Sequence, residues 1–185
     1  MLNEEKFANV KIAISGKSGC GNTTVSRMVA EKLKLKFINF TFRNLALESG
    51  LSLKEVLELA AADDFWDREV DRRQVKLARE SGGCVLGSRL AVWMLPEADL
   101  KVFFTAKAET RALRIHGREG ESLKEIEEFT ALRDEQDHGR YLRIYNIDND
   151  DYSFVDLVID TDDKSPAEIT DIIIIELNKK LSLLS

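Results

Sequence analysis

The chain has 185 residues, of which 44% are hydrophobic and 32% are charged, and its formal net charge is −6. This length suits one compact domain with its own core and is too short for two full domains. The composition excludes a disordered chain. The acidic balance argues against a protein that mainly holds nucleic acid. An anionic small ligand is compatible with this charge, because a local cluster of arginines can bind phosphate.

The cysteines, the histidines and the apolar runs indicate a cytoplasmic protein without membrane or zinc chemistry. Cys20 and Cys84 have no CxxC spacing, which is typical of reduced thiols. His116 and His138 have no partners at ligand spacing, which argues against structural zinc. The first residues lack the pattern of a signal peptide. The longest apolar run, 172–175, is far too short to span a bilayer.

Apolar patterning predicts strands that alternate with helices along the chain. Strands are expected over Val10–Ser15, Lys36–Phe40, Cys84–Leu86, Leu100–Thr105 and Leu157–Asp160. Helices are expected over Thr23–Lys34, in pieces between Phe42 and Glu80, over Lys107–Arg118, from Ser122 to Tyr145, and from Pro166 onward. This alternation predicts an α/β fold with a parallel five-stranded sheet flanked by helices.

Local signals mark where several of these helices begin and end. Gly50 is typical of a helix stop. Ser52 with Glu55, and Ser122 with Glu125, form capping boxes that begin new helices. Two helical segments, about 41–80 and 111–148, are too long for simple crossovers and indicate a substrate-binding insert and a lid. The core then comprises residues 1–40, 81–110 and 149–185.

A glycine-rich segment lies between the first predicted strand and the helix that follows. It reads Gly16-Lys17-Ser18-Gly19-Cys20-Gly21-Asn22-Thr23-Thr24 and nearly matches the phosphate-binding P-loop pattern G-x-x-x-x-G-K-[ST]. Backbone N–H groups of such a loop surround phosphate oxygens, and the helix N-terminus adds partial positive charge. The Thr23 hydroxyl would reach Mg²⁺. The lysine position holds Asn22, and the sequence leaves the place of the Lys17 amine open. A glycine turn without a ligand is the alternative interpretation.

Arginines from several segments are candidates for binding a transferred phosphoryl group, which is stabilised mainly by positioned positive charge. Arg89 follows a predicted strand directly, at the edge of the sheet where α/β folds bind ligands. Arg111, Arg114 and Arg118 recur at three- and four-residue spacing and so share a helix face. The remaining candidates are Arg43, Arg133 and Arg140, with Asp137 between the last two. Each of them taken alone is more typical of an exposed surface residue. The run 67–73 is equally consistent with an exposed helix face.

Short segments outside the loop complete a family pattern. They are Phe42-Arg43-Asn44-Leu45-Ala46, Asp67 through Gln74, Gly87-Ser88-Arg89-Leu90-Ala91, Trp93-Met94-Leu95-Pro96, Arg118-Glu119-Gly120, Arg140-Tyr141, Tyr145-Asn146-Ile147-Asp148 and Leu157-Val158-Ile159-Asp160-Thr161. Together with the loop they resemble the archaeal-type cytidylate kinases over nearly the whole chain. The resemblance implies a P-loop kinase fold with a nucleoside-monophosphate-binding insert and a mobile lid, acting on ATP and CMP or dCMP with Mg²⁺. A monomer is expected, because the sequence shows neither a coiled-coil heptad nor a long exposed apolar stripe.

The resemblance also implies roles for the candidate residues. Residues 16–24 and Arg111 would bind ATP, with Thr23 at Mg²⁺. Arg43, Arg89, Asp137 and Arg140 would bind the monophosphate. Arg133, with Arg114 and Arg118, would be catalytic.

Two positions depart from expected patterns, and two alternatives stay open. Asn22 stands at the lysine position of the general P-loop motif, where members of the family often have threonine, and Gly87 stands where the family usually has a carboxylate before Gly-Arg. The first alternative is a P-loop kinase for another small acceptor such as UMP. The second is a nucleotide-binding protein with weak or lost catalysis, and the presence of Arg133 argues against it.

Overall fold

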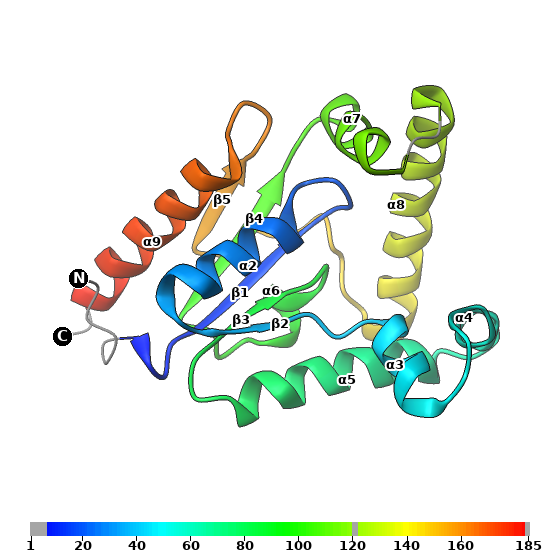
Figure 1. Ribbon diagram of the computed structural model, residues 1–185, viewed down its shortest axis with the longest axis horizontal. Helices are drawn as coiled ribbons and strands as arrows, with labels where there is room; N and C mark the ends of the chain where they lie inside the picture. Colours follow the sequence, from blue (N-terminus) through cyan, green and yellow to red (C-terminus); the bar gives the residue numbers. More distant parts are fainter. Residues whose placement is uncertain (1–6, 120–121, 184–185) are drawn as a thin grey trace.

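The computed structural model describes residues 7–119 and 122–183, in which five strands alternate with helices (Figure 1). The strands are β1 (Lys11–Gly16), β2 (Lys36–Ile38), β3 (Cys84–Gly87), β4 (Leu100–Thr105) and β5 (Leu157–Asp160). The helices are α2 (Asn22–Leu33), α3 (Phe42–Ser49), α4 (Leu53–Ala62), α5 (Phe65–Glu80), α6 (Ala91–Met94), α7 (Ala108–Glu119), α8 (Leu123–Tyr145) and α9 (Pro166–Leu183).

All four strand pairings are parallel, and the strand order is β2-β3-β1-β4-β5. The predicted α/β fold with a five-stranded parallel sheet is therefore confirmed. The strands are short apolar runs because both faces of the sheet are covered. In β1, Ile12 and Ile14 pack into a cluster with α2 and α9, whereas Ala13 faces the opposite cluster with α5 and α6.

The predicted helix ends agree closely with the structure. Gly50 follows α3 in the left-handed region with φ of 72°. The Glu55 N–H donates to Ser52 Oγ at 3.2 Å, and the Ser52 N–H donates to Glu55 Oε2 at 2.7 Å, which completes the predicted capping box. The short helix α6 was not predicted, because four residues are too few to show helical periodicity.

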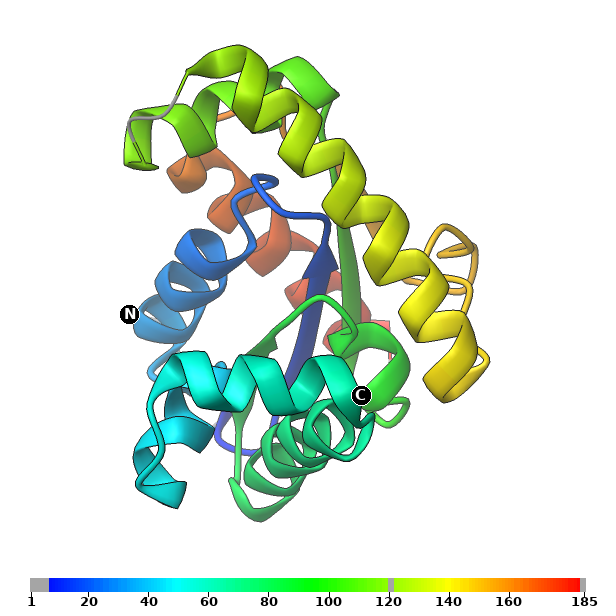
Figure 2. The same cartoon turned by 90° about the vertical axis from the view of Figure 1, so that its right-hand side faces the viewer.

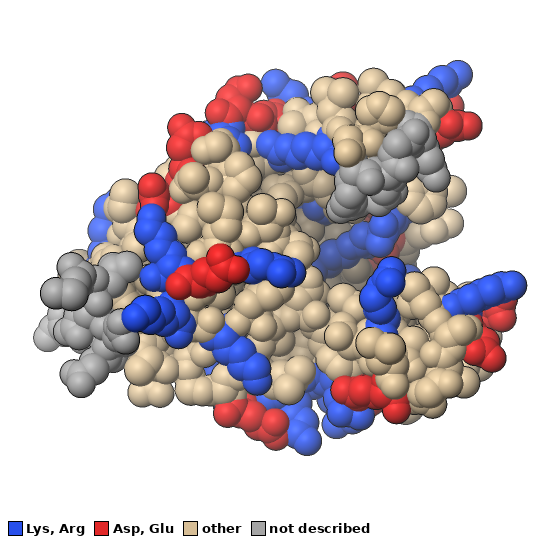
Figure 3. Space-filling model, viewed as in Figure 1, with Lys and Arg blue, Asp and Glu red and all other residues tan. Residues whose placement is uncertain are grey.

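Two helical groups flank the carboxyl end of β1. Figure 2 shows this strand ending between α8 on one side and the α3–α5 group on the other. The face drawn in Figure 3 is hollowed between these groups, and Lys or Arg side chains lie in the hollow. Within the described residues, no helix has both the length and the apolar character that crossing a bilayer requires.

Candidate active site

A cavity of about 720 Å³ opens at the carboxyl ends of the central strands. Its wall includes every residue from 16 to 24, together with residues of α5, α7 and α8 and the segment after β3. Four of the arginines predicted for the site also line it, namely Arg89, Arg114, Arg133 and Arg140. The fold therefore brings the glycine loop and these arginines to one place, where open α/β sheets bind ligands.

Two glycines let the loop take its path. Gly19 and Gly21 have φ of 85° and 89°, in the left-handed region that glycine enters without strain. A Cβ on Gly19 would lie 2.8 Å from both the Cβ and the carbonyl oxygen of Arg111. Only glycine therefore allows α7 to pack this closely against the loop. The Arg111 guanidinium strengthens this contact by donating to the Ser18 carbonyl oxygen at 3.2 Å.

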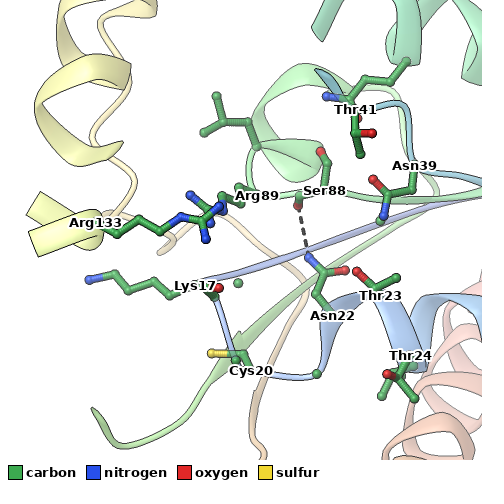
Figure 4. A pocket seen from close by; sticks show the side chains of 18 of the residues that line it. Lys17, Cys20, Asn22, Thr23, Thr24, Asn39, Thr41, Ser88, Arg89 and Arg133 are labelled. Atoms are coloured by element: carbon green, nitrogen blue, oxygen red, sulfur yellow. Dashed lines mark hydrogen bonds between the residues drawn. The ribbon is translucent and has the colours of Figure 1, made fainter. Parts of the chain in front are cut away.

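The Asn22 side chain joins the ends of two strands. Its Nδ2 donates to the carbonyl oxygen of Ile14 at 3.1 Å and to that of Ser88 at 3.2 Å, and Figure 4 draws the second bond. Its Oδ1 accepts a hydrogen bond from Ser26 Oγ at 3.0 Å. Both amide hydrogens are thus used by main-chain carbonyls of the protein. Asn22 lines the cavity but offers no charge there, and its amide ties β1 to the segment after β3.

Gly87 lies directly against the same group of residues. A Cβ at Gly87 would lie 2.5 Å from Ser26 Oγ, 2.7 Å from Ser26 Cβ and 3.2 Å from Asn22 Oδ1. Ser26 is fully buried on α2. The two unusual residues, Asn22 and Gly87, therefore belong to one packing arrangement, in which the small residue at 87 makes room for the Asn22–Ser26 pair.

Lys17 supplies a cation at the loop that Asn22 does not. Its Nζ lies 2.7 Å from Asp150 Oδ1. Both side chains are partly exposed, at 33% for Lys17 and 53% for Asp150, so the pair is open to exchange with solvent or a ligand. In Figure 4 the Lys17 side chain extends on the same side of the loop as Arg133. The amine that the sequence could not place is therefore at the cavity wall.

Three charged side chains form a cluster beside the loop, in which Asp137 is buried and Arg89 and Arg140 are partly exposed. Asp137 is 7% exposed and forms ion pairs with Arg89 and with Arg140, the latter at 2.8 Å. Burial lowers the pKa of Arg89 to about 10, and the nearby Arg133 and Arg140 act in the same direction. Arg89 is still protonated at neutral pH. The cluster therefore concentrates positive charge on one wall of the cavity.

Arg133 differs from its neighbours in having no hydrogen-bond or ion-pair partner among the described residues. It lies on α8, lines the cavity and points toward Arg89 (Figure 4). Among residues 7–119 and 122–183, none forms a hydrogen bond or ion pair with its guanidinium. All five donors of this arginine are thus available to a ligand.

The other predicted arginines lie in different surroundings. Arg111 pairs with Asp134 at 2.7 Å and is buried behind the loop. Arg114 lines the cavity and donates to Thr161 Oγ1 at 3.0 Å. Arg43 is exposed on α3 and is not among the residues that line the cavity. The side chain of Arg118 lies outside the described residues, so its predicted role is not addressed by the structure.

Three polar side chains on α5 line the cavity and were not predicted as site residues. They are Asp67, Asp71 and Gln74, which recur at helical spacing on one face. The opposite interpretation, an exposed charged face, holds only for their neighbours, such as Arg72, whose guanidinium pairs with Glu69 at 2.8 Å. The signal that could have separated the two faces is the placement of the polar residues at i, i+4 and i+7.

The loop side chain expected to bind Mg²⁺ is that of Thr23, through its hydroxyl oxygen. Thr23 is exposed and lines the cavity, so its hydroxyl fits the predicted Mg²⁺ contact. A second group, His138, Asp148 and Asp150, places three ligand-type atoms within 4.8 Å of one another. The Lys17 ammonium already neutralises Asp150 there, so this group is poorly suited to a cation. The donor set favours Mg²⁺ that is held mainly by nucleotide and water.

Comparisons with known proteins agree with this architecture. The model of the Cytidylate kinase-like family matches residues 11–163. A Cytidylate kinase 2 of Borreliella burgdorferi is 47% identical over 175 residues, covering 92% of this chain and 97% of that protein. A Cytidylate kinase of Pyrococcus horikoshii is 43% identical over 157 residues, covering 84% and 81%. The solved shikimate kinase from Acinetobacter baumannii is 19% identical, has a TM-score of 0.67 over 96% of this chain and 99% of that one, and is similar in fold alone. The chain belongs to the cytidylate kinase-like family.

Proposed function

We propose that the protein transfers the γ-phosphoryl group of ATP to CMP or dCMP, producing ADP and CDP or dCDP. The observation that carries this proposal is that the glycine loop and the arginines Arg89, Arg133 and Arg140 line one cavity. A donor phosphate at the loop and an acceptor phosphate at the cluster would be adjacent, as phosphoryl transfer requires. Family membership and the named relatives support cytidine nucleotides as acceptors.

The donor end comprises residues 16–24. Backbone N–H groups of the loop and the N-terminus of α2 would bind the ATP phosphates. Lys17 would exchange Asp150 for a phosphate oxygen and so supply the charge that Asn22 lacks. Arg111 and Arg114 would act mainly on the loop itself, since they donate to the carbonyl oxygens of Ser18 and Gly19.

The acceptor end is the cluster of Arg89, Arg140 and Asp137. Arg89 and Arg140 would bind the monophosphate, and Asp137 would hold both guanidiniums in place through its two ion pairs. Arg133, which has no protein partner in the described chain, would stabilise the charge on the transferred group. Arg43 would join the site only when the segment 41–80 closes toward the segment 111–148, and this closure would exclude water.

The chemical step needs no general base. The nucleophile is an oxygen of the acceptor phosphate, which is already anionic at neutral pH. It forms a bond to the γ-phosphorus, while the bond from that phosphorus to the bridging oxygen breaks. The electron pair leaves with ADP, so no proton has to be removed. Thr23 would be the protein ligand of a Mg²⁺ ion, which would neutralise charge on the donor phosphates.

We also propose that the protein works as a monomer in the cytosol. Within the described residues both cysteines, Cys20 and Cys84, are free and buried, which supports a reducing compartment. Sedimentation velocity of the purified protein measures its oligomeric state directly.

A coupled assay of ADP release tests the proposed function. It uses Mg-ATP with CMP, dCMP, UMP or AMP, and a control without acceptor. ADP release that depends on CMP or dCMP is the expected result. ADP release that no acceptor increases, together with calorimetric binding of nucleotide, would show a binding protein without transfer activity.

A further inference from the structure

The inward face of α5 is polar where a helix packed on a sheet is usually apolar. Asp67, Asp71 and Gln74 follow one another at helical spacing and all line the cavity. Gln74 is only 2% exposed. Buried polar groups normally have hydrogen-bond partners, so this face requires a physical explanation.

The hydrogen bonds around Asp71 fix the orientation of the Gln74 amide. Tyr145 Oη donates to Asp71 Oδ2 at 2.6 Å, and Gln74 Nε2 donates to Asp71 Oδ1 at 2.6 Å. Because the carboxylate only accepts, the amino group of Gln74 must face it and the carbonyl must point elsewhere. Gln74 Oε1 is buried and has no partner in the described chain. Gln74 Oε1 is thus an unused hydrogen-bond acceptor, and its own amide group bonds to the Asp71 carboxylate, which can accept further hydrogen bonds.

Unpartnered buried atoms concentrate at this cavity. The described residues contain six such side-chain atoms, and four belong to residues that line the cavity, namely Asp67, Gln74, Ser88 and Arg140. Asp67 and Arg140 face each other, with Oδ1 and Nε separated by 3.4 Å. That pair is explained by neutralising charge, whereas Gln74 Oε1 has no such explanation within the protein.

The surroundings of Gln74 match the edge and faces of a flat base. Phe42 and Val70 also line the cavity and offer apolar surface on which a ring can pack. Two neighbouring acceptors, Gln74 Oε1 and the Asp71 carboxylate, match the two N–H bonds of one exocyclic amine. Cytosine carries such an amine at C4, whereas uracil carries a carbonyl oxygen there that two acceptors would repel.

We propose that Gln74 and Asp71 read the acceptor base by accepting hydrogen bonds from the 4-amino group of cytosine. Tyr145 is a positioning residue that orients Asp71 from α8. This inference rests on the proposed function, because it assigns the residues that select CMP over UMP at the same site. Arg89 and Arg140 contact only the phosphate in this arrangement, so they do not distinguish the two bases.

The test compares kcat/KM for CMP with kcat/KM for UMP in two variants. In Asp71→Asn, the Asn carbonyl must accept from Tyr145, so its amide faces Gln74 and turns the Gln74 amino group toward the base. The acceptor becomes a donor, and the CMP:UMP ratio should fall by about tenfold or more with a gain on UMP. In Gln74→Met the ratio should fall through loss on CMP alone.

Controls separate base reading from general damage. Thr130→Val removes another buried oxygen that has no partner in the described part of the chain. It lies on α8 away from the cavity wall, so the variant should leave the ratio unchanged. Any change confined to phosphate binding alters both substrates equally and also leaves the ratio unchanged. If Asp71→Asn does not fold, Tyr145→Phe carries the test, with a smaller fall in the ratio expected.

The outcomes separate this inference from the proposed function. A CMP:UMP ratio that stays within about twofold of wild type in folded variants would overturn the assignment while leaving the kinase activity intact. If the wild type shows no turnover, calorimetric affinities for CMP and UMP in the same proteins give the ratio instead. A wild type that binds neither nucleotide would overturn both.

Discussion

Replacing Gly87 by alanine should destabilise the fold. A Cβ there would lie 2.5 Å and 2.7 Å from the Oγ and Cβ of Ser26, which is fully buried. Rotation of the hydroxyl does not relieve the contact with the Ser26 Cβ, whose position is set by the α2 backbone. Overpacking of this kind costs about 1–3 kcal/mol. For a domain of this size, a melting temperature lower by about 2–12 °C follows. Thermal melts followed by circular dichroism, together with urea titrations, measure the change.

A matched variant and a double mutant show whether the cause is this contact. Gly139→Ala places a Cβ in open space on α8 and should stabilise by about 0.5–1 kcal/mol, since alanine favours helix over glycine. Ser26→Gly removes both obstructing atoms, so Gly87→Ala should cost little in that background, giving a coupling of about 1–3 kcal/mol. Equal losses in both backgrounds would refute the packing argument.

Three other predictions concern the cavity and the thiols. Arg133→Ala should lower kcat by about 10³-fold or more with an unchanged melting temperature. The control Arg143→Ala lies on the same helix but outside the cavity and should leave kcat unaltered. A loss of kcat under about threefold in Arg133→Ala would remove Arg133 from the mechanism. Lys17→Ala should raise the dissociation constant for ATP by about tenfold in calorimetry and lower turnover, and unchanged ATP affinity would place the Lys17 amine away from the phosphates. Burial raises the pKa of both Cys20 and Cys84 to about 11, so at pH 8 about one thiol in a thousand is ionised. Neither thiol should therefore react with Ellman's reagent until urea unfolds the chain. Fast reaction in the folded state would contradict this expectation.

Much of the fold is encoded locally and could be predicted. The strands β4 and β5 fall where the apolar pattern places them, and α8 begins directly after its predicted cap, Ser122. Buried parallel strands need continuous apolar runs, and helix ends need particular capping residues, so these signals lie within a few positions of each other. The loop after β1 is recognisable for the same reason. The helix α6 was not predicted, because a helix of four residues is too short to show helical periodicity in its sequence.

The candidate site was predictable only in part. Arg89 follows a strand and Arg133 shares a long helix with Arg140, and the structure brings all three to one cavity, although their roles stay predictions. The sequence of the run 67–73 is equally consistent with an exposed helix face, because sequence alone does not show which side of α5 meets the sheet. Charged residues on its other side, such as Arg72, give the segment an exposed character.

The sequence by itself determined the order of strands and helices, the glycine loop and the identity of its unusual residues. Only the tertiary structure decided what those residues contact. Asn22 bonds to the carbonyl oxygen of Ser88, 66 positions away, and Lys17 reaches Asp150 from the other end of the chain. Such contacts depend on which strands become neighbours. Which strands become neighbours depends on packing of the whole core. All the helices and strands contribute to the free energy of burying both faces of the sheet, so no single segment determines the strand order.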